Sequence, residues 1–311
     1  MDQRRLGTSG LKVSVIGLGC NNFGMRIDQA ETQAVVDAAL GAGVNFFDTA
    51  DIYGGSQSEV FLGEALKGKR DQAVVATKFA GPMGEGPHRR GGSRRYIVQA
   101  VEASLKRLNT DRIDLYQIHF PDPDTPIDET LSALDQLVRD GKVLYFGNSN
   151  FSGWQIADAD WIARSGHRHR FVSAQNNFSL LERNSAREVL PACERFGLGF
   201  LPFFPLASGL LSGKYRKGEP APNDSRLAAW GARGAAAMSD KNLDRVEALR
   251  AWAEDHGHSL LELAFAWLLA HPAVSSVIAG ATRPEQVEAN AKAAAWSLTA
   301  EQRDEVTKLV S

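Results

Sequence analysis

The sequence predicts an α/β protein in which eight parallel strands close into a (β/α)8 barrel, in one domain spanning residues 1–311. Short apolar segments alternate along the chain with longer segments of helical spacing. Most of the apolar segments are nearly continuous, as expected for strands that are buried on both faces. Eight such segments can be recognised, and eight strands close a parallel barrel and fill its interior with side chains.

The elements follow in order. The expected strands are Val15–Cys20, Asn45–Ala50, Ala73–Lys78, Asp114–His119, Val143–Asn148, Val172–Asn177, Gly199–Pro205 and Ser275–Gly280. The expected helices are Gln29–Ala42, Ser58–Leu66, Arg94–Arg107, Ile127–Arg139, Gly153–Arg164, Ala186–Arg195, Lys241–Glu254, Leu260–Leu269 and Pro284–Ala295.

Residues at the helix ends support these boundaries. Ser93 can cap the helix that follows it through its hydroxyl group. Pro284 occupies a first helical turn, where no N–H donor is needed. Gly141 and Gly197 follow helices, at positions that favour a left-handed backbone.

Two further segments complete the expected architecture. Arg4–Leu6 and Leu11–Val13 flank a Gly-Thr-Ser-Gly turn, so we expect a β-hairpin that caps the N-terminal mouth of the barrel. The long connection Ala207–Asp240 follows the seventh strand and is rich in Gly, Ala, Pro and charge. A connection of this length in a compact domain is usually functional or mobile.

Composition excludes several classes of partner. The formal net charge of −2 gives no electrostatic reason to expect a nucleic acid or a membrane as a partner. Two distant cysteines, Cys20 and Cys193, indicate no disulfide framework. The first residues show no signal peptide and no apolar run reaches membrane-spanning length, so we expect a cytoplasmic protein. The pattern does not define the oligomeric state.

Three ionisable side chains, Asp48, Lys78 and His119, fall at or beside the carboxyl ends of expected strands. These ends converge on one rim of a parallel barrel, where active sites lie. Polar residues commonly mark the ends of strands, and this alternative explains Ser149 and Asn150 well. It explains Lys78 and Asp48 poorly, because an unpaired buried charge is costly, so we expect the two to pair.

Tyr53 adds a proton donor. It lies in the turn-like segment Asp51-Ile52-Tyr53-Gly54-Gly55 and can fold back over the rim. A nearby lysine ammonium lowers a tyrosine pKa from its ordinary value of about 10. We therefore expect Tyr53 to act as a general acid toward a carbonyl oxygen, with Asp48 holding Lys78 charged. His119 is expected to orient the carbonyl by a hydrogen bond. Taken alone, Tyr53 would be an exposed loop aromatic.

Four other motifs point less clearly to a function. Gly17-Leu18-Gly19-Cys20-Asn21-Asn22 is an incomplete dinucleotide-binding fingerprint, because Asn22 replaces the third glycine. No tyrosine has a lysine four residues later, as a short-chain dehydrogenase would need. The pairs in His167–His169 and His256–His258 are expected to be loop histidines, so no metal site is predicted. The basic run His88–Arg95 is expected to be a solvated loop, with an anionic ligand as the alternative.

At these residues the sequence resembles the aldo-keto reductase superfamily, in particular bacterial members and the related potassium-channel β-subunits. The matching stretches run in order over nearly the whole chain. They are Phe47-Asp48-Thr49-Ala50-x-x-Tyr53-Gly54, Ala76-Thr77-Lys78, Asp114-Leu115-Tyr116-Gln117-Ile118-His119, Gly147-x-Ser149-Asn150, Ser173-Ala174-Gln175, Pro205-Leu206-Ala207-x-Gly209-Leu210-Leu211-x-Gly213-Lys214-Tyr215 and Gly280-Ala281-Thr282-x-Pro284-Glu285-Gln286.

The resemblance implies a TIM barrel, NADPH-dependent reduction of aldehydes and ketones, and a catalytic tetrad of Asp48, Tyr53, Lys78 and His119. It implies that Ser149, Asn150 and Gln175 bind the nicotinamide carboxamide and that Phe203 stacks on the ring. Lys214 and Arg226 match phosphate contacts, and Thr282, Gln286 and Asn290 match the adenosine end. The full set of implied cofactor contacts is Cys20, Asn21, Asp48, Ser149, Asn150, Gln175, Phe203, Pro205, Leu206, Gly209, Lys214, Arg226, Gly280, Thr282, Arg283, Gln286 and Asn290.

The sequence departs from the family pattern at the cofactor end. Phe203 and Phe204 replace the tyrosine and serine of many members. Gly280 and Gln286 replace the lysine and arginine that grip the 2′-phosphate of NADPH in the best-known members. Arg283 can supply that charge, so NADPH is favoured and NADH remains possible.

Two functions are therefore expected. The first is carbonyl reduction of a small molecule, with Tyr53 as the proton donor. The alternative is a cofactor-sensing accessory subunit that binds NADPH with negligible turnover. For the substrate, aromatic side chains near the rim predict an apolar pocket, whose walls are Phe23, Phe79, Phe120 and Trp230.

Overall fold

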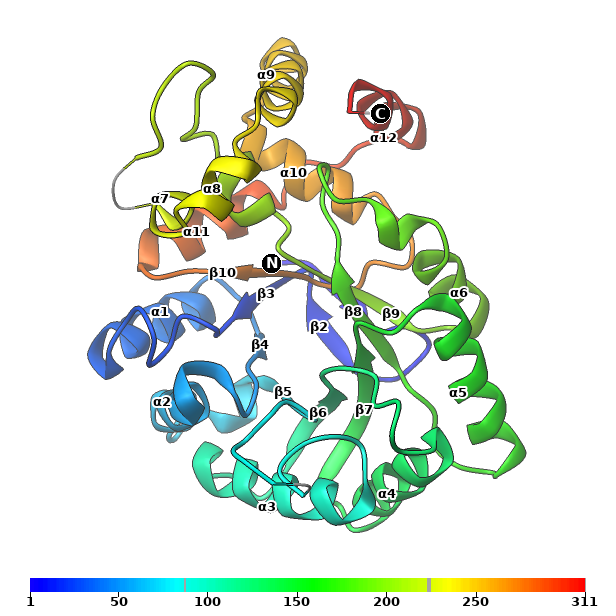
Figure 1. Cartoon of the computed structure of the whole chain (residues 1–311). Helices are drawn as coiled ribbons and strands as arrows, with labels where there is room; N and C mark the ends of the chain where they lie inside the picture. Colours follow the sequence, from blue (N-terminus) through cyan, green and yellow to red (C-terminus); the bar gives the residue numbers. More distant parts are fainter. Residues whose placement is uncertain (87, 223–224, 311) are drawn as a thin grey trace.

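Eight parallel strands close a barrel in the computed structural model, which describes residues 1–86, 88–222 and 225–310, without the side chains of Arg226 and Arg233. The strands follow chain order around the barrel, and the last pairs with the first (Figure 1). They are β3 Ile16–Gly19, β4 Phe46–Asp48, β5 Val74–Phe79, β6 Ile113–Ile118, β7 Val143–Ser149, β8 Ser173–Asn177, β9 Gly199–Phe203 and β10 Val277–Gly280. The predicted (β/α)8 fold is confirmed.

Helices surround this barrel (Figure 1). The expected helices are present, with ends that shift by a few residues. They are α1 Gln29–Gly41, α2 Gln57–Ala65, α3 Arg94–Leu108, α4 Ile127–Arg139, α5 Gly153–Ser165, α6 Val189–Phe196, α9 Asp240–Asp255, α10 Leu260–Leu269 and α11 Pro284–Ala293. The Ser93 hydroxyl accepts a hydrogen bond from the Tyr96 N–H, so Ser93 caps α3 as predicted.

Three helices were not expected. α7 Arg226–Ala229 and α8 Ala232–Ala237 lie in the long connection after β9. α12, Ala300–Leu309, follows α11 and is opened by a capping box between Thr299 and Gln302. Val306 is its buried residue. With so few apolar positions, α12 carries a weak periodic signal, and its cap was the clue that the sequence offered.

Strand register brings the rim residues together. Asp48 pairs with Ala76, Lys78 pairs with Gln117, and Ser149 pairs with Gln175. Since neighbouring strands lie about 4.8 Å apart, side chains on the inner face at these positions can contact one another. The polar residues of β4 to β8 therefore meet at the carboxyl end of the barrel.

The N-terminal hairpin closes the opposite end, as predicted. β1 Gln3–Arg5 pairs antiparallel with β2 Lys12–Ser14. Leu6 and Val13 are fully buried. They belong to a separate apolar cluster with inward residues of the barrel strands: Phe46, Ala76, Leu115, Leu201 and Ile278. The Arg4 guanidinium anchors the hairpin by donating to the carbonyls of Leu269 and Val274.

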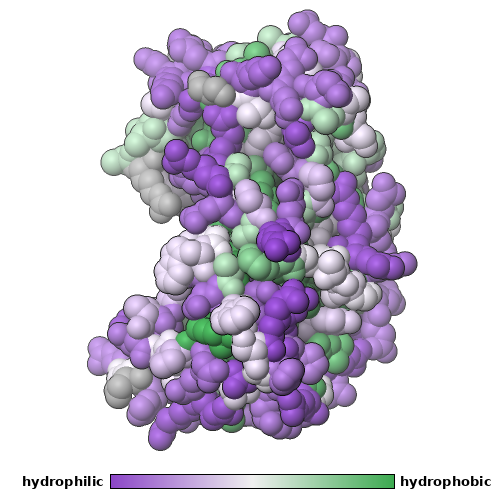
Figure 2. Space-filling model, turned by 90° about the vertical axis from the view of Figure 1, so that its right-hand side faces the viewer, coloured by the Kyte–Doolittle hydropathy of each residue, from purple (hydrophilic) through white to green (hydrophobic). Residues whose placement is uncertain are grey.

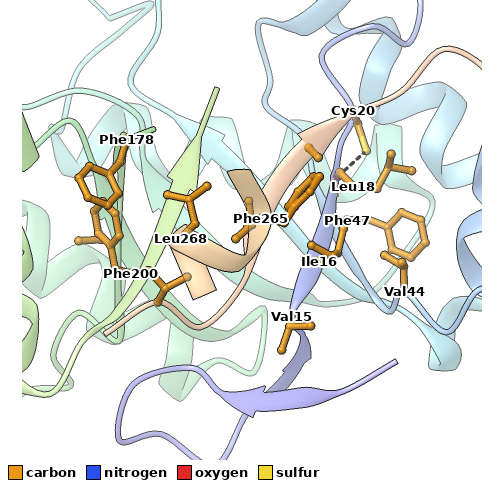
Figure 3. Close-up of a cluster of buried hydrophobic side chains, with 14 of the residues drawn as sticks. Val15, Ile16, Leu18, Cys20, Val44, Phe47, Phe178, Phe200, Phe265 and Leu268 are labelled. Atoms are coloured by element: carbon orange, nitrogen blue, oxygen red, sulfur yellow. Dashed lines mark hydrogen bonds between the residues drawn. The ribbon is translucent and has the colours of Figure 1, made fainter. Parts of the chain in front are cut away.

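The main core lies between the barrel and its helices. Figure 3 shows Leu18 and Phe47 from two barrel strands in the same cluster as Phe265 of α10. Phe178 packs edge-on against Phe200, with ring centroids 5.7 Å apart. Such aromatic pairs bury a large apolar area, so truncating one of them costs about 3–5 kcal/mol.

The surface is largely hydrophilic on the face shown in Figure 2, and the molecule is hollowed at the left edge of that view. Among the described residues, no helix combines the length and the apolar character needed to cross a membrane.

Candidate active site

A buried ion pair forms the base of the rim. Asp48 ends β4 and Lys78 lies near the end of the adjacent β5. The Lys78 ammonium donates to Asp48 Oδ2 at 2.6 Å and to the Thr49 carbonyl at 2.9 Å. The Lys78 side chain is 0% exposed and the Asp48 side chain 4%. The pair predicted from the cost of burial is therefore present.

Two glutamines complete the environment of Asp48. Its Oδ1 accepts hydrogen bonds from Gln117 Nε2 at 3.1 Å and from Gln175 Nε2 at 2.9 Å. Gln117 lies in β6 and was missed by the sequence interpretation. A single glutamine within an apolar strand was the available signal. With both carboxylate oxygens engaged, Asp48 is held in one orientation.

Tyr53 folds back over this pair on a tight turn. Tyr53 opens the short helix Tyr53–Ser56, in which Gly54 and Gly55 have positive φ angles of 57° and 62°. A side chain at Gly54 would place its Cβ 2.6 Å from the Phe23 carbonyl, so only glycine fits there. The Lys78 ammonium lies 5.2 Å from the centre of the Tyr53 ring.

Burial dominates the electrostatics of Tyr53. Desolvation raises the pKa of its hydroxyl above the ordinary value, and the Lys78 charge lowers that pKa only in part. The expectation of a net lowered tyrosine pKa is therefore wrong, because the cost of burying a phenolate exceeds the attraction of the ammonium. Tyr53 is consequently a protonated donor throughout the neutral range.

Lys78 stays charged, as expected. Burial opposes its charge, but Asp48 and Tyr53 together raise the lysine pKa above its ordinary value. The site therefore keeps one fixed positive charge next to the Tyr53 hydroxyl.

His119, directly after β6, is a neutral imidazole. Burial, followed by the Lys78 charge, lowers its pKa to about 3. Its ring stacks on Phe120 at 4.4 Å and meets the Tyr53 ring edge-on at 5.8 Å. His119 Nδ1 is buried without a hydrogen-bond partner among the described residues. A neutral imidazole carries one N–H, which is available to a carbonyl oxygen.

One cavity of about 830 Å³ opens above these residues, within the size range of ligand pockets. Tyr53, His119 and Phe120 line it. So do almost all of the predicted cofactor contacts: Cys20, Asn21, Asp48, Ser149, Asn150, Gln175, Phe203, Pro205, Leu206, Gly209, Lys214, Gly280, Thr282, Arg283, Gln286 and Asn290. The side chain of Arg226, the remaining one, lies outside the described part of the structure.

The polar groups beside the tetrad are already fixed. The Ser149 hydroxyl donates to the Gln175 carbonyl at 2.8 Å. Asn150 Nδ2 donates to the His119 carbonyl at 2.9 Å and to Ser149 Oγ at 3.2 Å. These contacts orient Ser149 and Asn150, to which the family resemblance assigned a role in nicotinamide binding.

Positive charge collects in the rest of the cavity. Arg26, Lys214 and Arg283 line it, and no described residue forms an ion pair with any of them. Asp48, the carboxylate among the described lining residues, is engaged by Lys78. This donor set fits a ligand with several phosphate charges. Arg26 was missed by the sequence interpretation, because it stands alone in a loop without a motif.

Two sets of close contacts shape the end of the cavity around Thr282 and Gly280. The Thr282 N–H and hydroxyl both bond Gln286 Oε1, at 2.8 and 3.2 Å. A Cβ at Gly280 would lie 3.3 Å from polar side-chain atoms of Asn21 and Asn22. The glycine thus leaves room for the amides of Asn21 and Asn22 at this part of the cavity, where the family pattern implied a lysine.

Of the four predicted substrate walls, one lines the cavity. Phe120 lines the cavity and is 43% exposed. Phe23 and Phe79 are 0% exposed and belong to the main core, so the expectation that they face the substrate is wrong. Phe79 stacks on Tyr116 at 4.7 Å in that core. Trp230 packs against the same core and does not line the cavity.

The histidine pairs lie elsewhere. His169 bonds Asp135 through Nδ1 at 2.8 Å, whereas His256 stacks on Trp252 and His258 on Trp296. Within the described residues, no group of three or more metal-binding side chains comes together.

Comparison with known proteins gives a consistent result. The sequence profile of the Aldo/keto reductase family matches residues 15–311. The chain is 39% identical to a rice protein named "Probable voltage-gated potassium channel subunit beta", over 94% of this chain and 91% of that protein. It is 38% identical to an Arabidopsis thaliana protein of the same name, with the same coverage. It is 37% identical to the Bacillus subtilis "Uncharacterized oxidoreductase YrpG", over 97% of this chain and 93% of that protein.

Proposed function

Since this chain belongs to the aldo/keto reductase family, we propose that it reduces small aldehydes or ketones to alcohols with NADPH, using Tyr53 as the general acid. Family membership supports an oxidoreductase that uses NAD(P)H. The observation that supports carbonyl reduction with Tyr53 as the acid is the buried Lys78–Asp48 pair below the Tyr53 ring. A bound nicotinamide cofactor supplies the hydride.

The proton comes from the Tyr53 hydroxyl. As negative charge develops on the carbonyl oxygen, the phenol transfers its proton and becomes a phenolate. The Lys78 ammonium stabilises that phenolate, since it lies 5.2 Å from the ring centre and is itself fully buried, where charge interactions are strong. Asp48 keeps the ammonium charged and in place.

His119 has a positioning task in this proposal. Because its pKa is about 3, it donates as a neutral imidazole and does not compete with Tyr53 as the acid. One N–H directed at the carbonyl oxygen fixes the substrate and stabilises the developing charge. The stacked Phe120 ring offers an apolar surface beside the oxygen.

The preference for NADPH rests on the charges of the cavity. Arg283 and Arg26 are proposed to hold the 2′-phosphate and neighbouring phosphates, in place of the lysine and arginine of other members. Asn290, which is 7% exposed, and Gln286 are proposed to contact the adenosine end. The free, buried Cys20 and Cys193 suit a reducing compartment, which supports the proposal of a cytoplasmic location.

The similarity to proteins named as potassium-channel subunits favours a second candidate. In this alternative the chain binds NADPH as an accessory subunit and turns over negligibly. A single-turnover absorbance trace separates the two functions. Bound NADPH that is never oxidised by a broad aldehyde and ketone panel would support the accessory role.

Replacing Tyr53 by phenylalanine tests the catalytic proposal. We expect reductase activity to fall by about 10²–10⁴-fold, the usual contribution of a general acid, while NADPH binding measured by fluorescence stays unchanged. Tyr145→Phe is the matched control, because Tyr145 packs at the hairpin end of the barrel. Full activity in Tyr53→Phe would refute the assigned role.

A further inference from the structure

A second cluster of buried polar groups lies behind the turn that carries Tyr53. Asp51, two residues before Tyr53, is 1% exposed, and its N–H donates to the Lys78 carbonyl at 3.1 Å. The carboxyl group of Asp51 points away from the cavity lining and toward Tyr96 of α3. Its Oδ1 is buried without a partner among the described residues.

Tyr96 connects two segments through one hydroxyl group. Its hydroxyl lies 3.4 Å from Asp51 Oδ2 and 3.3 Å from the Gly81 carbonyl oxygen. A phenol has one proton, so it can donate to one of these acceptors at a time. If Asp51 is protonated, its own O–H can donate to Tyr96, and Tyr96 then donates to Gly81. If Asp51 is ionised, Tyr96 is drawn to the carboxylate and the Gly81 carbonyl loses this donor.

The charges around Asp51 decide which arrangement is present. Glu59 of α2 is fully buried nearby and is paired with Arg107 of α3 at 2.6 Å. Burial, and then the Glu59 charge, raise the pKa of Asp51 to about 7, while Arg107 lowers it in part. The remaining facing groups are the phenols Tyr96 and Tyr116, whose pKa values are raised by burial, and Arg89, which acts on Tyr96 from the β5–α3 connection.

We propose that Asp51 is a positioning residue for Tyr53: its protonated carboxyl completes a hydrogen-bonded chain through Tyr96 to the Gly81 carbonyl, and loss of this proton releases the β5–α3 connection. That connection is drawn in cyan between β5 and α3 in Figure 1. It packs on the Tyr53 turn, since a Cβ at Gly81 would meet the Ile52 side chain at 2.7 Å.

The same connection also reaches the segment after His119. The Gly92 N–H donates to Asp122 Oδ2 at 2.7 Å, and Asp122 lies three residues beyond His119. The β5–α3 connection therefore bridges the turn of the proposed acid and the segment of the proposed oxygen-binding imidazole. Releasing one side changes how Tyr53 and His119 face each other across the carbonyl.

Amide hydrogen exchange tests the chain of hydrogen bonds without depending on the proposed reductase activity. The probes are the amides of Met83 and Gly91, which bond the carbonyls of Arg89 and Ala80 within the connection. Wild type is compared with Asp51→Asn at the same pH, so that the intrinsic exchange rate cancels. An asparagine amide can donate to Tyr96 at any pH, as the protonated acid does.

At about pH 6 the two proteins should exchange alike. At about pH 8 we expect the wild-type amides to exchange on the order of tenfold faster than those of Asp51→Asn, the factor that corresponds to losing one hydrogen bond. In Tyr96→Phe the same amides should exchange fast at both pH values, because the phenol that bonds the Gly81 carbonyl is gone. Tyr116→Phe is the control, because the Tyr116 hydroxyl is buried in the same cluster and has no partner among the described residues. Equal exchange of wild type and Asp51→Asn at pH 8 would overturn the proposal.

The second readout rests on the proposed function. In wild type, kcat/KM for a carbonyl substrate should decline as the pH rises through neutrality, because Asp51 loses its proton there. The decline should be absent from Asp51→Asn. Neither Tyr53, with its raised pKa, nor His119, with its pKa of about 3, titrates there. Identical pH profiles for the two proteins would contradict a positioning role. A protein without reductase activity would refute the proposed function and leave the exchange result to decide the chain of hydrogen bonds.

Discussion

The buried imidazole of His119 makes a quantitative prediction about acid sensitivity. Its pKa lies near 3 in the folded protein and near 6.5 in an unfolded chain. The folded-state pKa is lowered, so its stabilising contribution is complete above pH 6.5 and is lost as the pH falls toward 3. At pH 4.5 the histidine of the unfolded chain is almost fully protonated, whereas His119 of the folded protein is still neutral. This difference stabilises the unfolded state about a hundredfold and removes about 3 kcal/mol of stability.

Replacing His119 by glutamine removes this titration. We expect the unfolding free energy of His119→Gln, relative to wild type, to rise by about 3 kcal/mol between pH 7.5 and pH 4.5. Urea unfolding at both pH values measures the change, and the pH-independent cost of the substitution cancels in the difference. His167→Gln, at an exposed histidine, serves as the control. A change below about 1 kcal/mol would show that His119 is protonated near its ordinary pKa, and burial would then not be what holds the imidazole neutral.

Two other substitutions test the charges of the site. Lys78→Met should destabilise the fold by roughly 3–5 kcal/mol in urea unfolding, because it leaves the Asp48 carboxylate buried without its counter-ion. Adding Asp48→Asn should restore much of that loss, and a double variant no more stable than the single one would argue against the pair. Arg283→Ala should weaken NADPH binding about tenfold to a hundredfold in a fluorescence titration and leave NADH binding unchanged. Lys292→Ala, an exposed position on the helix that follows Arg283, is the control, and an equal loss for both cofactors would show that Arg283 does not bind the 2′-phosphate.

The barrel and the meeting of Asp48, Lys78 and His119 at one rim were predictable because both follow from short-range patterns. Buried parallel strands read as apolar runs, and Asp48, Lys78 and His119 interrupt such runs at their carboxyl ends. The pairing of Lys78 with Asp48 followed from the cost of an unpaired buried charge alone. Only its place within an apolar strand marked Gln117, whose importance comes from the register that places it opposite Lys78.

One error could have been avoided from the sequence, and the others came from tertiary context. Side chains alternate along a strand, so Lys78 pointing into the barrel forces Phe79 outward into the helix layer. That alternation was available in the sequence and excluded Phe79 from the cavity. The pKa of Tyr53 was not available, because it depends on how completely the turn is covered by other segments. The position of Arg26 at the cavity likewise could not be predicted, because it depends on how its loop packs in the fold.

The N-terminal hairpin constrains the order in which the chain can fold. Arg4 is anchored to the carbonyls of Leu269 and Val274, about 270 residues later in the chain, and its strands pack on a barrel that closes when β10 joins β3. During synthesis the hairpin leaves the ribosome before the barrel strands, yet its docking surface is complete only after β10 has been made. Contacts of such long sequence separation form slowly. We therefore expect the hairpin to dock late in folding, after the barrel has closed.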